Sequence, residues 1–399
     1  LIALAPDWFG WFIFGEPGNV HLVLLTAGCL ATVIAYNFAT ELFTALRQMR
    51  AVSIMAMVNS VLFAAIGVGL LSLRQDAGMI LIAYGVACAT TALVAVAALW
   101  RITSQSPTDT ASLAHGALWT RLMPFAVGVW VTNLLVNLFA VSDRYMIMHF
   151  SGLDRDAAAA LVGNYHSSRV VPVLLASIAG MVGGMLLPYL SRDWEAGRRD
   201  AASDQVNLVL KAFGLLLFAA GIGVLAFSPF LFTVVLAGKY ASGLDVLPWT
   251  TVYCIWFSLS LLAGSYLWCA ERPRMTCLIY FLGLLGNVAL NAVLVPRWGL
   301  PGAVWATAAA NGLALALSLL VAYRLGLKRD AGVWLPVVVP LALPLGAPIA
   351  FVVLAAVAWI AVRTNWIFTV DQRQQFFAAL APYWRKFAPT PAAESTTPG

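Results

Sequence analysis

Long apolar segments recur along the whole chain, and they constrain its fold more than any other feature. Each is long enough to cross a hydrocarbon core of about 30 Å as an α-helix. The chain lacks the weak alternation, in stretches of about ten residues, that is typical of membrane β-barrels. We therefore predict an all-α, polytopic transmembrane helix bundle. The predicted spans are 19–46, 51–72, 77–100, 122–150, 160–190, 206–235, 245–270, 275–296, 301–323 and 333–362.

Composition supports a membrane protein and argues against other classes. The chain is 62% hydrophobic and 10% charged, whereas a soluble domain is about 25% charged. The net charge of +6 belongs mostly to the loops between spans, so it predicts no nucleic-acid partner. The cysteines and histidines lack metal-ligand spacing, and we find no HExxH, Walker A or GxSxG motif. We predict no metal site, no cofactor and no enzymatic activity.

Lysine and arginine are distributed unevenly between alternate loops, and this distribution predicts the orientation of the chain. One set of loops contains Arg47, Arg50, Arg101, Arg121, Arg192, Arg198, Arg199, Arg272, Arg274, Arg324, Lys328 and Arg329. The opposite set contains only Arg74, Arg155, Lys239 and Arg297. The positive-inside rule places the first set in the cytoplasm.

Landmarks recur at an offset of about 224 residues, which is typical of transporters built from two related lobes. The pairs are Arg50 with Arg274 in cationic turns, Gly78 with Gly302 at span starts, and Arg101 with Arg324 at span ends. The counterpart of the second lobe's start would lie before Leu1, so we expect the N-terminal lobe to be incomplete here. We predict a partial N-terminal helical lobe at 1–102, a cytoplasmic linker at 103–120 and a C-terminal six-helix lobe at 121–326. A further transmembrane helix at 333–362, bent by prolines, precedes an amphipathic or disordered tail at 363–399.

Charged side chains inside spans are the strongest site candidates. A charge at the bilayer centre costs about 3 kcal/mol or more, so it is kept where it has a partner or faces water. Spans 122–150 and 160–190 form a predicted hairpin with its outer tip near residue 155. Asp143 and Arg169 then lie at nearly the same depth, and we predict an ion pair between them.

A polar stripe accompanies this pair. Asn133, Asn137 and Arg144 share one helix face and, with Arg169, could line a water-filled cavity. Guanidinium groups there would suit an anionic headgroup, because they bind phosphate oxygens in a bidentate manner. The alternative is that the two asparagines join neighbouring helices and that Arg144 snorkels to the outer headgroups.

Three further features are weaker candidates. Glu41 either faces the cavity or is solvated near the cytoplasmic end of its span. Lys211 is expected to snorkel to the cytoplasm. Asn287 and Asn291, spaced i and i+4, are expected to pack helices together rather than bind a ligand.

Two stretches resemble a known family. One is "SDRYMIMHFSG" (142–152) with "VGNYHSSRVVPVLLASIAGMVGGMLLPYLSR" (162–192), and the other is "GNVALNAVLVPRWGLPGAVWATAAANG" (286–312). They resemble polysaccharide flippases of the O-antigen and exopolysaccharide type. This family belongs to the multidrug/oligosaccharidyl-lipid/polysaccharide exporter superfamily, which also contains multidrug exporters and peptidoglycan-precursor flippases.

The resemblance implies two six-helix lobes around a central cavity, working by alternating access. The implied substrate is an undecaprenyl-diphosphate-linked oligosaccharide, moved across the bacterial inner membrane for lipopolysaccharide or exopolysaccharide synthesis. Its expected partners are this lipid-linked oligosaccharide, membrane lipids and a polysaccharide polymerase. The alternatives are a drug or cation antiporter using Glu41 and Asp143, a non-transporting scaffold, and a membrane-embedded glycosyltransferase or ligase.

Overall fold

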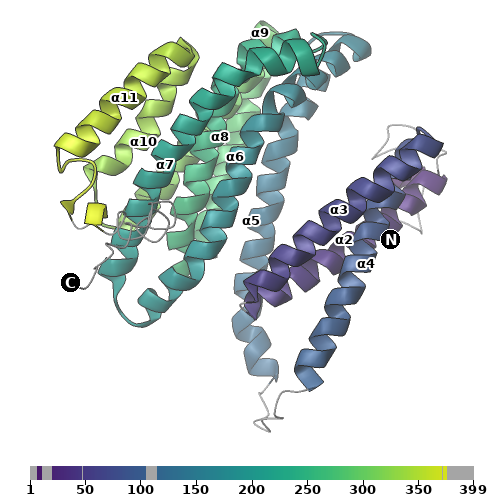
Figure 1. The fold of residues 1–399 in the computed structure, drawn as a ribbon, viewed down its shortest axis with the longest axis horizontal. Coiled ribbons are helices and arrows are strands. Elements are labelled where there is room, and N and C mark those ends of the chain that lie inside the picture. The colour runs from purple at the N-terminus through teal and green to yellow at the C-terminus, as the bar shows by residue number, and fades with distance from the viewer. Residues whose placement is uncertain (1–6, 11–19, 47, 105–114, 371, 375–399) are drawn as a thin grey trace, which may run out of the picture. The chain divides into compact units, whose positions relative to one another are not determined.

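The computed structural model describes residues 7–10, 20–46, 48–104, 115–370 and 372–374, and their regular structure is helical throughout. The described part contains eight helices long and apolar enough to cross a membrane. These features confirm the predicted all-α polytopic class. The chain divides into two compact units, residues 1–113 and residues 114–399, called here the N-terminal unit and the C-terminal unit (Figure 1). Each is described by itself, and the predicted division at the linker 103–120 stays a prediction.

Three helices form the described core of the N-terminal unit: α2 (Val20–Ala45), α3 (Met49–Leu73) and α4 (Ala77–Ser104). They match the predicted spans 19–46, 51–72 and 77–100. The helices α2 and α3 both pack against α4. A Cβ atom on Gly85 of α4 would lie 3.4 Å from the Cα atom of Cys29 in α2. Small residues therefore let these backbones approach closely, as is usual between helices in a membrane.

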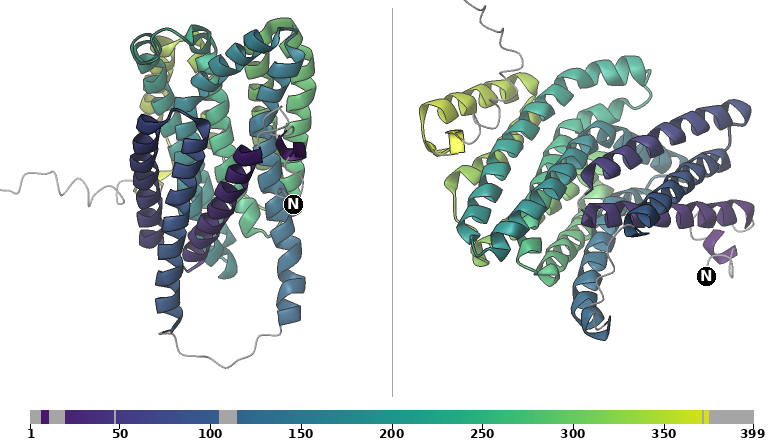
Figure 2. Two further views of the ribbon diagram at one scale, coloured as in Figure 1. Left: turned by 90° about the vertical axis from the view of Figure 1, so that its right-hand side faces the viewer. Right: turned by 60° about the horizontal axis from the view of Figure 1, so that its bottom comes forward.

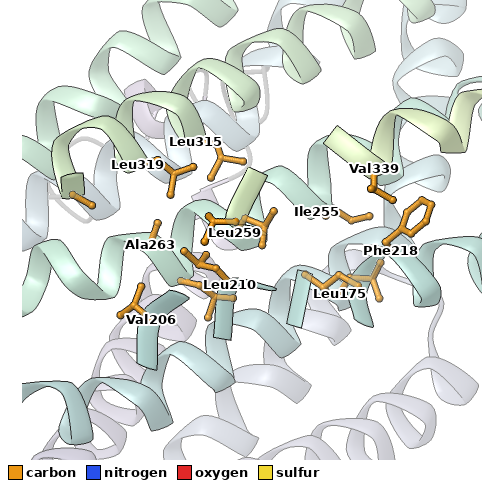
Figure 3. Close-up of a cluster of buried hydrophobic side chains, with 14 of the residues drawn as sticks. Leu175, Val206, Leu210, Phe218, Ile255, Leu259, Ala263, Leu315, Leu319 and Val339 are labelled. Carbon is orange, nitrogen blue, oxygen red and sulfur yellow. The ribbon is translucent and has the colours of Figure 1, made fainter. Parts of the chain in front are cut away.

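The C-terminal unit begins with five long helices that lie alongside one another (Figures 1 and 2). They are α5 (His115–Phe150), α6 (Arg155–Glu195), α7 (Arg199–Phe230), α8 (Ala241–Cys269) and α9 (Pro273–Arg324). The helix α8 is buried along most of its length and packs against α6, α7 and α9. Leu210 and Phe218 of α7, Ile255 and Leu259 of α8, and Leu315 of α9 meet in the apolar core shown in Figure 3.

The helix α9 contains two predicted spans, 275–296 and 301–323. It is broken between them at Gly299, whose φ of 55° and ψ of −126° are not helical. Pro296 and Pro301 flank the break. A Cβ atom on Gly302 would lie 2.3 Å from the carbonyl oxygen of Leu294, so only glycine fits there. The break at Gly299 thus lets the chain reverse its direction without a long loop.

The predicted single helix at 333–362 is wrong. The chain instead forms a short 3-10 turn (Ala331–Val333), α10 (Trp334–Val338), a 3-10 segment (Val339–Leu345) and α11 (Ala347–Arg363). Pro340 and Pro344 cannot donate backbone hydrogen bonds, and Gly346 turns the chain at a φ of 101°. Two apolar segments of 331–345 and 347–363 result, which we call the C-terminal hairpin.

The first residues after α11 pack against the C-terminal unit, and the amphipathic or disordered character expected of the tail 363–399 stays a prediction. Ile367 is buried, and Arg373 donates from Nη1 to the carbonyl oxygen of Val362 at 3.1 Å. Gln372 reaches Lys211 of α7, which also binds Asp330 just before the hairpin. Both ends of the hairpin therefore lie at one end of the unit. Residues 375–399 lie outside the described part.

A polar stripe on α7 holds this end in place. Ser203 Oγ accepts the backbone N–H of Lys328 at 2.7 Å, and Asn207 Nδ2 donates to the Lys328 carbonyl at 3.0 Å. The Lys328 side chain donates to Asp204 at 2.9 Å. This hydrogen bond and the Asp204 charge raise the pKa of the Lys328 amine. The i, i+4 spacing of Ser203 and Asn207 puts both on one helix face.

Lys211 continues the stripe and does not snorkel. Its side chain is 1% exposed, and its Nζ lies 2.5 Å from Asp330 Oδ2 and 2.7 Å from Gln372 Oε1. The ring of Phe368 lies 5.6 Å from the same Nζ. Asp330, Phe368 and Gln372 surround the ammonium group, so it bonds to protein instead of reaching water.

We expect Lys211→Met to loosen the C-terminal hairpin. Removing one partner of a buried ion pair leaves the other uncompensated, and we expect a cost of about 2–4 kcal/mol because Asp330 is partly exposed. The purified variant should melt at a lower temperature and be cleaved faster near residue 330 in limited proteolysis.

The double variant Lys211→Met/Asp330→Asn should recover part of the loss, because no unpaired carboxylate remains. Lys239→Met, at an exposed lysine, is the matched control and should behave like the wild type. Equal melting temperatures and cleavage rates for Lys211→Met and Lys239→Met would contradict the assignment.

Candidate functional site

A carboxylate buried in α5 is the centre of the candidate site. Asp143 is 1% exposed, and three side-chain donors surround it. The Tyr165 hydroxyl of α6 donates to Oδ2. Asn287 and Asn291 of α9 donate from Nδ2 to Oδ1 at 2.9 Å and 3.0 Å. Sequence reasoning missed these partners, although their i, i+4 spacing put both asparagines on one face.

The hydrogen bonds continue beyond the carboxylate. Ser142 Oγ donates to Asn287 Oδ1 at 2.7 Å, and Asn287 Nδ2 lies 3.3 Å from Thr307 Oγ1. Asn311, one turn beyond Thr307, donates to the Thr307 carbonyl at 2.8 Å. Because Thr307 follows the break at Gly299, the network joins α5, α6 and both halves of α9. We call these residues, with Asp143, Tyr165 and Asn291, the Asp143 network.

The predicted Asp143–Arg169 ion pair is wrong. Arg169 Nη1 donates to the Ala140 carbonyl at 3.1 Å, and its guanidinium carbon lies 5.3 Å from the centroid of the Tyr165 ring. Tyr165 thus stands between the two charges, with its hydroxyl on the carboxylate and its ring beside the guanidinium. The half-buried Arg169 side chain keeps its Nε buried without a hydrogen-bond partner among the described residues.

The two charged side chains nevertheless border one cavity of ≈180 Å³. Tyr253, Thr307 and Asn311 supply further polar groups, and the remaining lining residues are mostly apolar. A hydroxyl chain continues from Tyr253 to Tyr165 at 3.5 Å. The cavity is smaller than the roughly 300–1,000 Å³ of typical ligand pockets, so it suits one polar group rather than a whole lipid-linked molecule.

Arg144 lies next to Asp143 but contacts a different partner. Its Nη2 lies 3.3 Å from His166 Nδ1. Because arginine is only a donor, His166 Nδ1 accepts this bond and the imidazole is neutral. The Arg144 Nε is buried without a partner among the described residues. Sequence reasoning missed His166, yet the predicted tip near residue 155 pairs position 144 with position 166.

The other predicted site residues lie apart from the Asp143 network. Asn133 and Asn137 are exposed on α5, and Asn137 Nδ2 donates only to the Asn133 carbonyl of its own helix, at 2.8 Å. Glu41 is exposed on α2, in the N-terminal unit. Roles for these three in substrate binding stay predictions. Among the described residues, no group of His, Cys, Asp and Glu side chains could hold a metal ion.

Comparisons with known proteins bear on this fold. A family model described as "Polysaccharide biosynthesis protein" matches residues 1–194, just under half of the 399 residues. The lipid II flippase MurJ of Bacillus subtilis is 23% identical over 268 residues, which cover 65% of this chain and 47% of that protein. The uncharacterized membrane protein MJ1068 of Methanocaldococcus jannaschii is 24% identical over 166 residues, covering 41% and 32%. The chain therefore matches less than half the length of these curated relatives.

A solved structure shares the fold. The lipid II flippase MurJ in an inward closed conformation matches with a TM-score of 0.61 at 12% identity, over 97% of this chain and 82% of that chain. At this identity the match establishes a shared fold. Together the comparisons confirm the resemblance to the superfamily of polysaccharide and lipid-linked oligosaccharide exporters. The chain is a multi-pass membrane protein with that helical fold.

Replacing Asp143 should destabilise the helix packing. Asp143→Ala removes the acceptor of three interhelical hydrogen bonds, each contributing about 0.6 kcal/mol in a membrane, so the expected cost is about 2 kcal/mol. The purified variant should melt at a clearly lower temperature than the wild type. Asn137→Ala, which removes a bond within one helix, is the matched control and should change the melting temperature little. Equal effects of the two variants would contradict the central place of Asp143.

Proposed function

We propose that the chain is a flippase that moves an undecaprenyl-diphosphate-linked oligosaccharide from the cytoplasmic to the outer leaflet of the bacterial inner membrane. The transported unit would serve cell-surface polysaccharide synthesis, with a polysaccharide polymerase as the partner that consumes it. The proposal makes the chain a transporter and not an enzyme. It extends to this chain the kind of activity that the name of the lipid II flippase MurJ describes.

The observation that carries the proposal is the Arg169 guanidinium at an intramembrane cavity. Arg169 Nη1 donates one hydrogen bond to the Ala140 carbonyl, and the Arg169 Nε has no partner among the described residues. A half-buried cation with spare donors is costly in a membrane, so an anionic ligand accounts for its presence. A diphosphate fits, because a guanidinium fork binds two phosphate oxygens at once.

Arg144 and His166 extend this cationic surface. They lie on the same helix pair, and the register of the hairpin puts them close to the depth of Arg169. The Arg144 Nε has spare donor capacity, and the outward nitrogen of neutral His166 can donate as well. We propose that these groups receive the diphosphate in the outer half of the membrane while the polyprenyl tail stays in lipid.

Asp143 acts indirectly in this scheme. Its carboxylate fixes the Tyr165 hydroxyl, and the Tyr165 ring in turn lies beside the Arg169 guanidinium. Asp143 is thus a positioning residue that orients Arg169 and holds α5 against α6 and α9. It also balances the arginine charge while no substrate is bound.

We expect Arg169→Ala to reduce export strongly. In a strain whose own gene is deleted, this variant should lower surface polysaccharide at least tenfold and cause lipid-linked oligosaccharide to accumulate inside, since losing a charge-assisted hydrogen bond pair costs about 3 kcal/mol. Arg169→Lys should retain part of the activity, because the charge remains but the bidentate fork is lost. Arg155→Ala, at the exposed start of α6, is the matched control and should restore export.

Two outcomes would count against the proposal. Full export by Arg169→Ala, at normal protein levels, would remove the arginine from the substrate path. Normal surface polysaccharide in the deletion strain, together with altered drug resistance, would favour an antiporter in which the buried Asp143 carries the coupled cation.

A further inference from the structure

A second pocket lies in the C-terminal unit, at the end opposite to the arginine cluster. Its volume is ≈430 Å³, within the roughly 300–1,000 Å³ of small-molecule sites. Phe125 of α5, Trp194 and Glu195 of α6, Trp268 of α8 and Glu271 of the α8–α9 turn line it. We call it the tryptophan pocket. The positive-inside distribution places this end in the cytoplasm.

The aromatic rings of the tryptophan pocket are held by packing. Trp194 packs edge to face against Tyr266, with ring centroids 5.3 Å apart, and Arg199 lies over its ring at 4.9 Å. Trp268 packs against Phe125 at 6.2 Å. Rings fixed in this way offer flat apolar walls at little further cost in side-chain entropy.

The carboxylates distinguish this pocket from an ordinary interfacial belt of tryptophans. Glu195 and Glu271 form no ion pair within the described part of the chain, although arginines are abundant on both turns. The neighbouring Asp193 does pair, with Arg198 at 2.6 Å. Two exposed carboxylates on different helix hairpins therefore border one cavity, and no described residue binds either of them.

We infer that the tryptophan pocket binds a sugar ring of the transported molecule. A pyranose ring has an apolar C–H face that packs on an aromatic ring, whose face carries the negative end of its quadrupole. Its hydroxyl groups donate to carboxylates in charge-assisted hydrogen bonds. A cationic ligand fits less well, because the arginines on the same turns repel it.

This inference rests on the proposed function and assigns the oligosaccharide a place of its own. Phe125 and Arg144 are 19 residues apart on α5, which corresponds to about 28 Å along the helix. The sugar pocket and the arginine cluster thus lie near opposite faces of the membrane. A molecule arriving from the cytoplasm would be recognised by its sugar at the first site and held by its diphosphate at the second.

Saturation-transfer NMR on the full chain in lipid nanodiscs tests the inference without requiring transport. The probes are the methyl glycosides of glucose, galactose, rhamnose and N-acetylglucosamine, with tetramethylammonium as the cation probe. We expect at least one glycoside to bind. Glu195→Gln and Glu271→Gln should each weaken its binding roughly tenfold, as expected for one lost charge-assisted bond, and Trp268→Ala should abolish it.

Trp359→Ala, at an exposed tryptophan of α11, is the matched control and should bind like the wild type. Binding of no glycoside would overturn the inference, as would glycoside binding unaffected by the pocket variants or pocket-dependent binding of tetramethylammonium alone. The melting temperature of each variant separates lost binding from lost folding. Glycoside binding without lipid-linked transport would contradict the proposed function and leave the pocket as a sugar site. Transport without glycoside binding would contradict only the assignment of the sugar pocket.

Discussion

The structure of the C-terminal unit depends on satisfying one buried carboxylate inside the membrane. An ionisable group in hydrocarbon is kept only when its environment compensates it, and Asp143 receives donors from both α6 and α9. These bonds fix three helices at one point and one depth. The Tyr165 ring then sets the position of Arg169. The position of the half-buried Arg169 guanidinium is therefore a consequence of how the carboxylate is compensated.

Lys211 lies at the other end of the unit, and its buried charge is stabilised in a different way. Its charge meets an acidic partner directly, with 2.5 Å between Nζ and Asp330 Oδ2. The pair fastens the C-terminal hairpin to α7, whereas the Asp143 network leaves an arginine with spare donors. In the first arrangement the cation is paired with an acid, and in the second the Arg169 Nε keeps no hydrogen-bond partner among the described residues.

Much of the fold follows from the sequence because helix length and hydropathy are local properties. The hairpin of α5 and α6 shows how far this extends: its tip near residue 155 places Asp143, Arg144, Tyr165, His166 and Arg169 at similar depths. Depth alone could not decide that Tyr165 stands between Asp143 and Arg169, because that depends on helix rotation. The break at Gly346 was also missed, because prolines at 340 and 344 are compatible with a bend as well as with a reversal.

The most direct test of the account is transbilayer movement in vitro. The purified chain would be reconstituted into liposomes containing a fluorescent undecaprenyl-diphosphate-linked oligosaccharide, and the label on each leaflet would be measured with an impermeant quencher over time. The account predicts that label crosses the bilayer faster with the folded chain than in protein-free liposomes. Equal rates with and without the folded chain would contradict it.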